Sequence, residues 1–172
     1  VRIVAATAPI RRPGRRARGH PLQDRSHLMQ IIDLAVRPSK GATPERVLEL
    51  SCDPEAGVMG DHGSTRRRQI TLLSTEQWQS ACEQVGHEVA WTTRRANLLV
   101  SGGAFGPEHD GRKLRIGAVE ILIHGELVPC QQMEDQQPGL LQSLQPDWRG
   151  GLHGEIIAAG TIRPGDALEI LD

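Results

Sequence analysis

Short β-branched and apolar runs, each closed within a few residues by glycine or proline, constrain this chain more than any other feature. The runs lie at residues 29–36, 46–50, 69–73, 96–100, 114–117, 119–123, 154–159 and 167–171. Many short strands separated by turn signals are typical of β-barrels and β-sandwiches. Only one strong helix signal interrupts them, and residues 138–144 add one or two helical turns. We therefore expect a mainly β fold, either a closed barrel or a sandwich with helical insertions.

The strong helix signal begins at Ser74. Ser74 and Gln77 have the spacing of a capping box, in which the hydroxyl and the amide satisfy opposite backbone donors. The apolar residues that follow at helical spacing are Trp78, Ala81, Cys82 and Val85. Gly86 then supplies a stop. This pattern predicts a helix from Thr75 with Cys82 facing the core, and we assign no chemistry to that thiol.

Residues 1–28 differ from the rest in composition. They contain seven arginines and one aspartate, so they carry +6 while residues 29–172 carry −7 of the total of −1. The lack of a period, together with proline, glycine and like charges, predicts disorder. Three explanations stay open: sequence upstream of a misassigned start, a basic targeting arm, or an arm that binds nucleic acid. The strand pattern at Met29 favours the first, so we expect one domain over 29–172 and no nucleic-acid partner.

The cysteines exclude two classes of small protein. Cys52, Cys82 and Cys130 are an odd number at wide spacing, which fits neither a disulfide framework nor the paired ligands of a structural zinc site. We therefore expect a reducing compartment, the cytoplasm. No apolar run reaches 18 residues, so the sequence predicts no transmembrane helix and no membrane partner.

Cys130 follows Pro129 at the end of a strand-like run. Proline fixes φ and cannot donate to a sheet ladder, so Pro129 is expected to end the strand and to leave the thiol at the start of a loop. A lone cysteine is more often a small buried hydrophobe, and that interpretation stays open beside the functional one. As a thiolate, Cys130 is a soft ligand suited to a transition metal.

Two cationic segments are candidates to surround that thiol. The glycine-rich stretch 53–68 is long for an internal loop and ends in Arg66, Arg67 and Arg68. Arg94 and Arg95 precede a buried run that begins near Asn97. A solvated surface segment stays open as the alternative interpretation of both. His62 lies alone in the glycine-rich stretch, where a histidine usually makes only a hydrogen bond.

Seven short strings, taken in order, resemble the MOSC domain, a family named from the C-terminal part of molybdenum cofactor sulfurase. The strings are Gly60-Asp61-His62, Arg68-Gln69-Ile70-Thr71-Leu72-Leu73-Ser74, Thr93-Arg94-Arg95-Ala96-Asn97-Leu98, Leu114-Arg115-Ile116-Gly117, Pro129-Cys130-x-x-Met133, Arg149-Gly150-Gly151 and Ile162-Arg163-Pro164-Gly165-Asp166. The resemblance is to small bacterial standalone members and covers 29–172. It implies a closed β-barrel of the kind seen in pyruvate kinase.

The resemblance also implies a site. By matching position, Cys130 is the cysteine that ligates molybdenum in a pterin cofactor or carries sulfur as a persulfide. An Arg-x-Asn element lies against the cofactor in amidoxime-reducing members, and it matches Arg95 and Asn97. Guanidinium groups suit the pterin phosphate, and an amide both donates to and accepts from ring atoms. The candidate cofactor-binding residues are therefore Arg94, Arg95, Asn97, Arg67, Arg68 and, in a supporting role, His62.

We expect Cys130, Arg95 and Asn97 to converge on one concave site closed by residues 57–68. Three functions remain open for that site. The first is a molybdenum-dependent oxidoreductase that reduces N-hydroxylated substrates with Cys130 as the metal ligand. The second is a sulfur-carrier or cofactor-handling module with a persulfide on Cys130. The third is a barrel that has kept the fold and lost the metal.

The oxidoreductase would need an external electron donor. The sequence contains no nucleotide-binding glycine loop and no cysteine cluster, so a separate flavin or iron–sulfur protein is implied. Larger relatives carry an N-terminal β-rich half that helps to hold the cofactor. Residues 1–28 are too short to replace that half. Pyridoxal phosphate is not expected, because Lys40 and Lys113 are the only lysines and neither has a recognisable Schiff-base setting.

Overall fold

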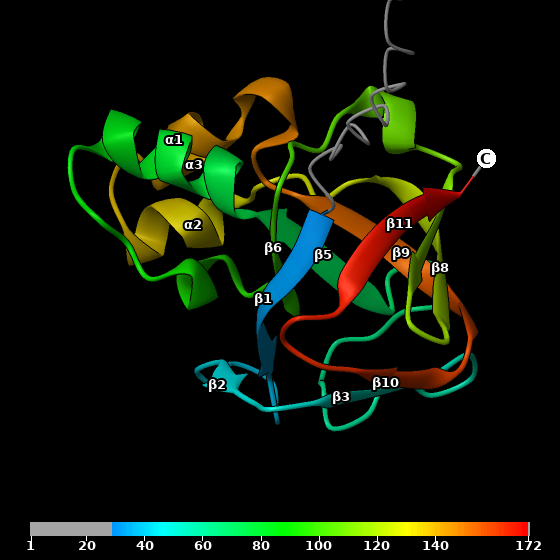
Figure 1. The fold of residues 1–172 in the computed structure, drawn as a ribbon. Coiled ribbons are helices and arrows are strands. Elements are labelled where there is room, and N and C mark those ends of the chain that lie inside the picture. Colours follow the sequence, from blue (N-terminus) through cyan, green and yellow to red (C-terminus); the bar gives the residue numbers. More distant parts are fainter. Residues whose placement is uncertain (1–28, 172) are drawn as a thin grey trace, which may run out of the picture.

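Seven strands close into a barrel in the computed structural model, which describes residues 29–171 (Figure 1). In hydrogen-bonded order they are β11 (Ala167–Leu171), β7 (Lys113–Ile116), β8 (Val119–Glu126), β9 (Leu152–Ala158), β5 (Ile70–Ser74), β6 (Leu98–Ser101) and β1 (Met29–Val36). β1 pairs with β11 at Met29 and Leu168, which closes the ring. The mainly β fold and the closed barrel are confirmed. The expectations for residues 1–28 lie outside the described residues.

One pairing in the barrel is parallel, that of β5 with β6. Parallel neighbours need a long crossover connection, and α1 (Thr75–Val85) supplies it. β5 is buried along its whole length, with Leu72 in the barrel interior and Leu73 under the helices. Burial on both faces explains why this strand is an unbroken apolar run in the sequence.

A small three-stranded sheet lies at the end of the barrel that is lowest in Figure 1. It contains β3 (Leu50–Asp53), β4 (Gly57–Val58) and β10 (Gly160–Ile162), while β2 (Glu45–Arg46) pairs with β1. The strand predicted at 46–50 is therefore divided between β2 and β3, because residues 47–49 pass from the barrel to the small sheet. The long loop predicted at 53–68 contains β4, which folds back on β3.

Three short α-helices gather on one side of the barrel (Figure 1). The sequence predicted at most two. They are α1, α2 (Gln131–Gln136) and α3 (Leu140–Leu144). Short 3₁₀ turns are η1 (Trp91–Arg94), η2 (Pro107–His109) and η3 (Pro146–Trp148). No helix within residues 29–171 is long and apolar enough to cross a membrane.

The caps of α1 are confirmed in part. The Ser74 hydroxyl accepts a hydrogen bond from the Gln77 backbone N–H at 3.3 Å, and Gly86 ends the helix in the left-handed conformation. The Gln77 amide does not complete the capping box, and that half of the prediction was wrong. Its Oε1, the atom that would accept from the Ser74 backbone N–H, instead accepts from the Phe105 backbone N–H at 2.9 Å, while its Nε2 donates to the carbonyl oxygens of Phe105 and Asp147 at 2.8 and 2.6 Å.

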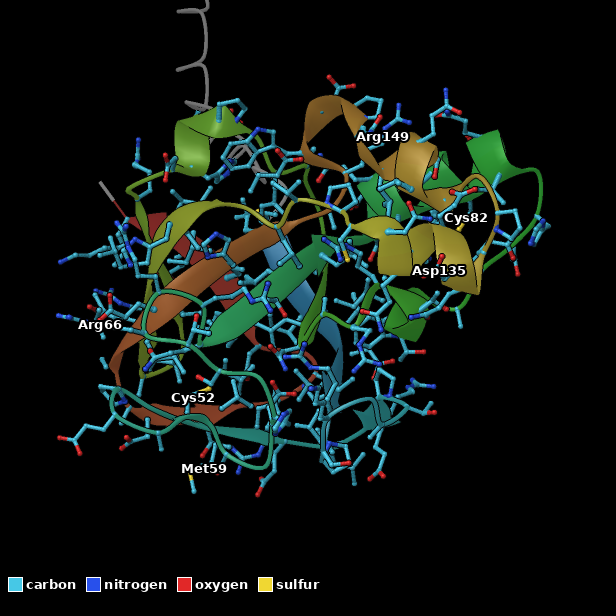
Figure 2. The ribbon with its side chains drawn as sticks, turned by 180° about the vertical axis from the view of Figure 1, so that it is seen from behind. Cys52, Met59, Arg66, Cys82, Asp135 and Arg149 are labelled. Atoms are coloured by element: carbon cyan, nitrogen blue, oxygen red, sulfur yellow. The ribbon has the colours of Figure 1, made fainter. Side chains whose placement is uncertain are left out.

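The core has two parts, and each contains a buried cysteine. Aliphatic side chains of the barrel strands and the small sheet fill the interior, where Cys52 lies. The second part packs α1, α2 and α3 against the outer faces of β5 and β6, and it contains Cys82, as the helix pattern predicted. Figure 2 shows the two thiols in these separate layers.

Candidate functional site

Cys130 is the exposed member of the three free cysteines. β8 ends at Glu126, so the strand stops before Pro129 rather than at it. Leu127 and Pro129 are buried, and Cys130 then adopts an extended conformation as the residue preceding α2. The sequence predicted a loop after Cys130, where the structure has a helix. That helix is six residues long and buries only Met133, which is too little apolar periodicity to read from the sequence.

Four arginines share a cavity with the Cys130 thiol. The cavity has a volume of about 140 Å³. Its lining consists of Arg37, Arg68, Arg94, Arg95, Thr71, Leu127, Val128, Cys130, Gln132 and Met133. These residues come from the end of β1, the segment before β5, the end of η1, and the connection from β8 into α2. Sequence segments that lie far apart therefore bring positive charge to one soft sulfur ligand.

Arg94 forms the buried wall of this cavity. Its side chain is 5% exposed, and its Nε donates to the carbonyl oxygen of Gly150 at 2.8 Å. Nη2 donates to the carbonyl oxygen of Leu127, and Nη1 contacts the Met133 sulfur at 3.8 Å. A side chain at position 150 would overlap the Leu127 carbonyl oxygen, so glycine is required there. Arg94 thus ties the segment that carries Cys130 to the glycine-rich loop before β9.

Burial also changes the electrostatics of Arg94. The pKa of Arg94 is lowered to about 10, mainly by loss of water; Arg68 acts in the same direction, while Cys130 and Glu126 act in the opposite one. A pKa near 10 still leaves the guanidinium charged at neutral pH. Arg94 therefore contributes a fixed, poorly hydrated positive charge next to the thiol. Its donors are already engaged with the protein, so it does not offer the free fork that the sequence interpretation assigned to it.

Arg95 and Asn97 have different environments although only one residue separates them. Arg95 has a left-handed backbone (φ 63°), and its Nη1 donates to the carbonyl oxygen of Ala42 at 2.9 Å. Partial burial lowers the pKa of Arg95, and the neighbouring Arg37 adds to that effect while Asp61 opposes it. The Arg95 side chain lines the cavity.

Asn97 lies behind the cavity wall. It is 1% exposed, and its Oδ1 accepts hydrogen bonds from the backbone N–H and the hydroxyl of Thr71 at 3.1 and 2.9 Å. Its Nδ2 donates to the carbonyl oxygen of Ala35 at 3.2 Å. The amide therefore joins β1 to β5, and Thr71 rather than Asn97 lines the cavity. The expected convergence holds for Cys130 and Arg95, and Asn97 supports it from the second layer.

The segment 57–68 borders the cavity through one of its three arginines. Arg68 lines it, whereas Arg67 is exposed and its carbonyl oxygen lies 3.1 Å from His153 Nδ1. Arg66 points outward from the segment (Figure 2). The His62 side chain is exposed and does not line the cavity, while its backbone N–H donates to the carbonyl oxygen of Arg37.

Arg37 is the cavity residue that the sequence interpretation missed. Its backbone N–H and Nε donate to Asp61 Oδ1 at 2.7 and 3.1 Å, and Nη2 forms an ion pair with Asp61 Oδ2 at 2.5 Å. This contact fastens the glycine-rich segment to the end of β1. A cation directly after a predicted strand was the available signal, but only the fold shows which strand ends meet.

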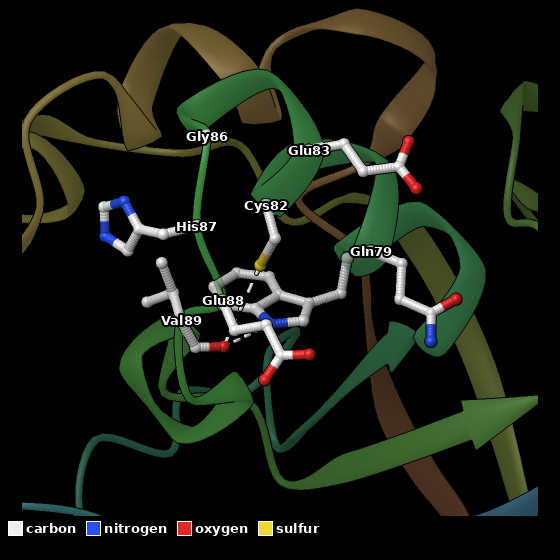
Figure 3. A pocket seen from close by; sticks show the side chains of 8 residues that line it. Gln79, Cys82, Glu83, Gly86, His87, Glu88 and Val89 are labelled. Atoms are coloured by element: carbon white, nitrogen blue, oxygen red, sulfur yellow. Dashed lines mark hydrogen bonds between the residues drawn. The ribbon is translucent and has the colours of Figure 1, made fainter.

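A larger groove, of about 700 Å³, lies beside α1 and is lined by Cys82 (Figure 3). Its lining is Trp78, Gln79, Cys82, Glu83, Gly86, His87, Glu88 and Val89. Trp78 Nε1 donates to the carbonyl oxygen of Val89 at 2.9 Å, and the Cys82 sulfur lies 3.8 Å from the same oxygen. This groove shares no lining residue with the Cys130 cavity and has carboxylates where that cavity has arginines.

The residues around Cys130 fit a molybdenum-pterin cofactor in donor chemistry. An exposed thiol is a soft metal ligand, and arginines suit a phosphate. Among residues 29–171, no group of three or more His, Cys, Asp or Glu could hold a metal ion, so a metal here would depend on the cofactor. The cavity of 140 Å³ is smaller than the roughly 300–1,000 Å³ of most small-molecule sites, so it admits only part of such a cofactor.

Comparisons with known proteins agree with the fold and the motif order. The MOSC domain model matches residues 59–169, and no curated protein matches the chain. The YuaD protein from Bacillus subtilis superposes with a TM-score of 0.69 at 20% identity, covering 83% of this chain and 96% of YuaD. YiiM from Geobacillus stearothermophilus gives 0.66 at 18% identity, covering 84% and 75% of the two chains. YiiM from Escherichia coli gives 0.61 at 20% identity, covering 83% and 70%. The family model spans most of the chain, and this protein therefore belongs to the MOSC domain family.

Proposed function

We propose that this MOSC protein binds a molybdenum-pterin cofactor through Cys130 and reduces N-hydroxylated small molecules. The observation that carries the proposal is the exposed Cys130 thiol in a cavity lined by four arginines. The other two thiols are buried, and neither lies among arginines. Family membership supports the cofactor assignment.

Each cavity residue has a role in this proposal. Cys130 supplies the soft ligand, and Arg94 holds the segment that carries it. Arg37, Arg68 and Arg95 offer charge-assisted donors to the cofactor phosphate. Arg37 gives up part of its pairing with Asp61 if it turns toward that phosphate. Asn97 keeps Thr71 and the start of β6 in place behind them.

The chemistry supplied by the bound cofactor is a two-electron redox centre. The overall reaction breaks an N–O bond, forms an N–H bond and releases water, and it consumes two electrons and two protons. A separate flavin or iron–sulfur protein in the cytoplasm delivers the electrons, since such a donor site was not found in the sequence.

Molybdenum content tests the metal ligand directly. Wild-type protein, Cys130→Ser and Cys82→Ser should be purified from a host that makes the cofactor. We expect the molybdenum content of Cys130→Ser to be about one tenth of the wild-type content or lower, because the variant loses a direct ligand. Cys82→Ser is the matched control and should retain the wild-type amount. Equal metal in wild type and Cys130→Ser would end the proposal.

A sulfur carrier is the second candidate, favoured by the exposure of Cys130 and by the small volume of its cavity. In that function Cys130 receives a sulfur atom from a cysteine desulfurase and holds it as a persulfide. Incubation with a desulfurase and free cysteine should then add the mass of one sulfur to Cys130 alone. Persulfide on Cys130 in protein that takes up no molybdenum would replace the first function by the second.

A further inference from the structure

A second cavity adjoins the one that contains Cys130. It has a volume of about 250 Å³, and we call it the polar cavity. Its lining is Gly41, Thr43, Pro44, Thr92, Thr93, Arg95, Gln132 and Gln136. Arg95 and Gln132 line both cavities, so the two spaces meet at these side chains. A molecule that fills the polar cavity therefore contacts Arg95 and Gln132, which also line the cavity of the thiol.

Most polar side chains of this cavity are free to bind a ligand. Thr43, Thr92, Thr93, Gln132 and Gln136 make no side-chain hydrogen bond to another of the described residues. By contrast, the buried amide of Gln69 bonds at both ends, to Pro54 and to Ile156, at 2.7 Å each. Three hydroxyls and two amides without a partner among residues 29–171 thus line one space.

The charge of the polar cavity separates it from its neighbour. Its lining within residues 29–171 has no carboxylate and a single cation, Arg95, of which only Nη1 has a hydrogen-bond partner there. The Cys130 cavity contains the same cation together with three more arginines. A phosphate dianion suits the second set better than the first.

The lining also excludes large apolar groups. Among the residues that the structure describes, Pro44 is the only apolar side chain of any size in the lining, and none of them offers an aromatic stacking face. An aromatic or largely apolar ligand would leave these hydroxyls and amides without partners, which costs binding free energy. The matching ligand is small, rich in hydrogen-bonding groups and singly negative.

We infer that the polar cavity binds the non-reacting end of the substrate and selects small, hydrophilic, singly anionic N-hydroxylated compounds. This inference rests on the proposed function for the reacting end. The carboxylate of such a substrate pairs with the donors of Arg95 that the cofactor phosphate, held mainly by Arg37 and Arg68, leaves free. Its polar atoms contact the free hydroxyls and amides, and its N-hydroxyl group extends past Gln132 toward Cys130. The reaction keeps the balance given above, with both electrons from the separate donor protein.

Calorimetric titration of the full chain tests the selection without turnover. Succinic acid monohydroxamate is the polar anionic probe, benzohydroxamate the aromatic one, and succinate the probe without an N-hydroxyl group. We expect succinic monohydroxamate to bind at least about tenfold more tightly than benzohydroxamate, since only it satisfies Arg95 and the free polar groups. Equal or tighter binding of benzohydroxamate would overturn the inference.

Matched variants locate the binding. Gln136→Leu and Thr93→Val remove hydrogen-bonding groups from the polar cavity alone, and Gln79→Leu makes the same kind of change beside α1. Each of the first two should weaken succinic monohydroxamate and succinate by about twofold to tenfold and leave benzohydroxamate unchanged. Gln79→Leu should change none. Gln136 is exposed, so its variant is expected to fold even if Thr93→Val does not.

Two further outcomes separate this inference from the proposed function. If Gln136→Leu lowers molybdenum content and leaves the affinity for both succinate compounds unchanged, the polar cavity holds the cofactor and the inference is wrong. If succinate binding depends on Gln136 while Cys130→Ser retains its molybdenum, the anion site stands and the proposed function fails.

Discussion

The Cys130 cavity and the groove beside α1 both contain a cysteine, but in different environments. Cys82 lies within α1, is 8% exposed and directs its sulfur at the Val89 carbonyl oxygen (Figure 3). Cys130 is exposed among arginines at the start of α2. The groove is the larger hollow, at about 700 Å³ against 140 Å³. Volume alone therefore does not mark the functional site; the sign of the charge and the availability of polar groups do.

Cys52 extends the comparison to a third environment. It lies in the barrel interior, and burial raises the pKa of its thiol to about 12. A thiol with that pKa is almost entirely protonated at neutral pH and is neither a good nucleophile nor a good metal ligand. Buried thiols, whether in the barrel or under the helices, are thus expected to be inert.

We expect the largest effect from Arg94, because its hydrogen bonds hold the segment that carries Cys130. Arg94→Met leaves the carbonyl oxygens of Leu127 and Gly150 without their buried donor. We expect a loss of about 3 kcal/mol in the free energy of unfolding, measured by urea denaturation. Arg67→Met on the exposed segment is the control and should change it by less than about 0.5 kcal/mol. A loss below about 1 kcal/mol for Arg94→Met would show that the buried contacts are not what holds the Cys130 segment.

Asn97 gives a smaller effect that distinguishes the wall of the cavity from its lining. Asn97→Ala removes the acceptor of the Thr71 hydroxyl proton and the amide donor to the Ala35 carbonyl oxygen, so we expect about 2 kcal/mol of destabilisation. The molybdenum content per folded molecule should stay near the wild-type amount. An intact stability with lost molybdenum would instead make Asn97 a direct ligand of the cofactor.

Arg68 tests the positive charge itself. The ratio of iodoacetate to iodoacetamide rates at Cys130 reports local potential, because only the first reagent is anionic. Arg68→Gln should lower this ratio by about twofold to fivefold, and 1 M salt should lower it in the wild type as well. Arg66→Gln is the control because that side chain points outward (Figure 2). If the ratio changes neither in Arg68→Gln nor in 1 M salt, the arginines do not set the electrostatic potential at the thiol.

His153 should give the smallest effect, through the segment that carries Arg68. Burial lowers the pKa of His153, and its contact with the Arg67 carbonyl oxygen opposes that effect. Since the folded state binds this proton less readily than the unfolded state, stability is complete above the unfolded pKa of about 6.5 and falls as pH decreases through it. Urea unfolding between pH 8 and pH 5 should therefore lose more stability in wild type than in His153→Gln. An identical pH profile for the two proteins would contradict the assignment.

The sequence was sufficient for the elements that depend on local pattern. β1, β5 and α1 lie where periodicity and capping placed them, and the motif order predicted the barrel. The exposure of Cys130 agrees with the functional interpretation of its proline-cysteine motif rather than with the buried one.

The site contacts were harder to predict because they join distant residues. Arg94 and Gly150 are 56 positions apart, and Arg37 and Asp61 are 24 apart. No local pattern predicts that the Arg94 guanidinium donates to backbone carbonyl oxygens, or that Asn97 is buried behind Thr71. The fate of the Gln77 amide has the same origin, since it bonds to Asp147, 70 positions away.

Partial alkylation of the three thiols tests the central claim most directly. Wild-type protein without cofactor should be treated with limiting iodoacetamide near neutral pH and analysed by mass spectrometry of its peptides. Cys130 is expected to be labelled first, with Cys82 and Cys52 following only as the protein unfolds, and molybdate should slow labelling of Cys130 by occupying the arginines. Equal labelling of all three, or earlier labelling of Cys82 with no protection of Cys130, would contradict the assignment of the chemistry to Cys130.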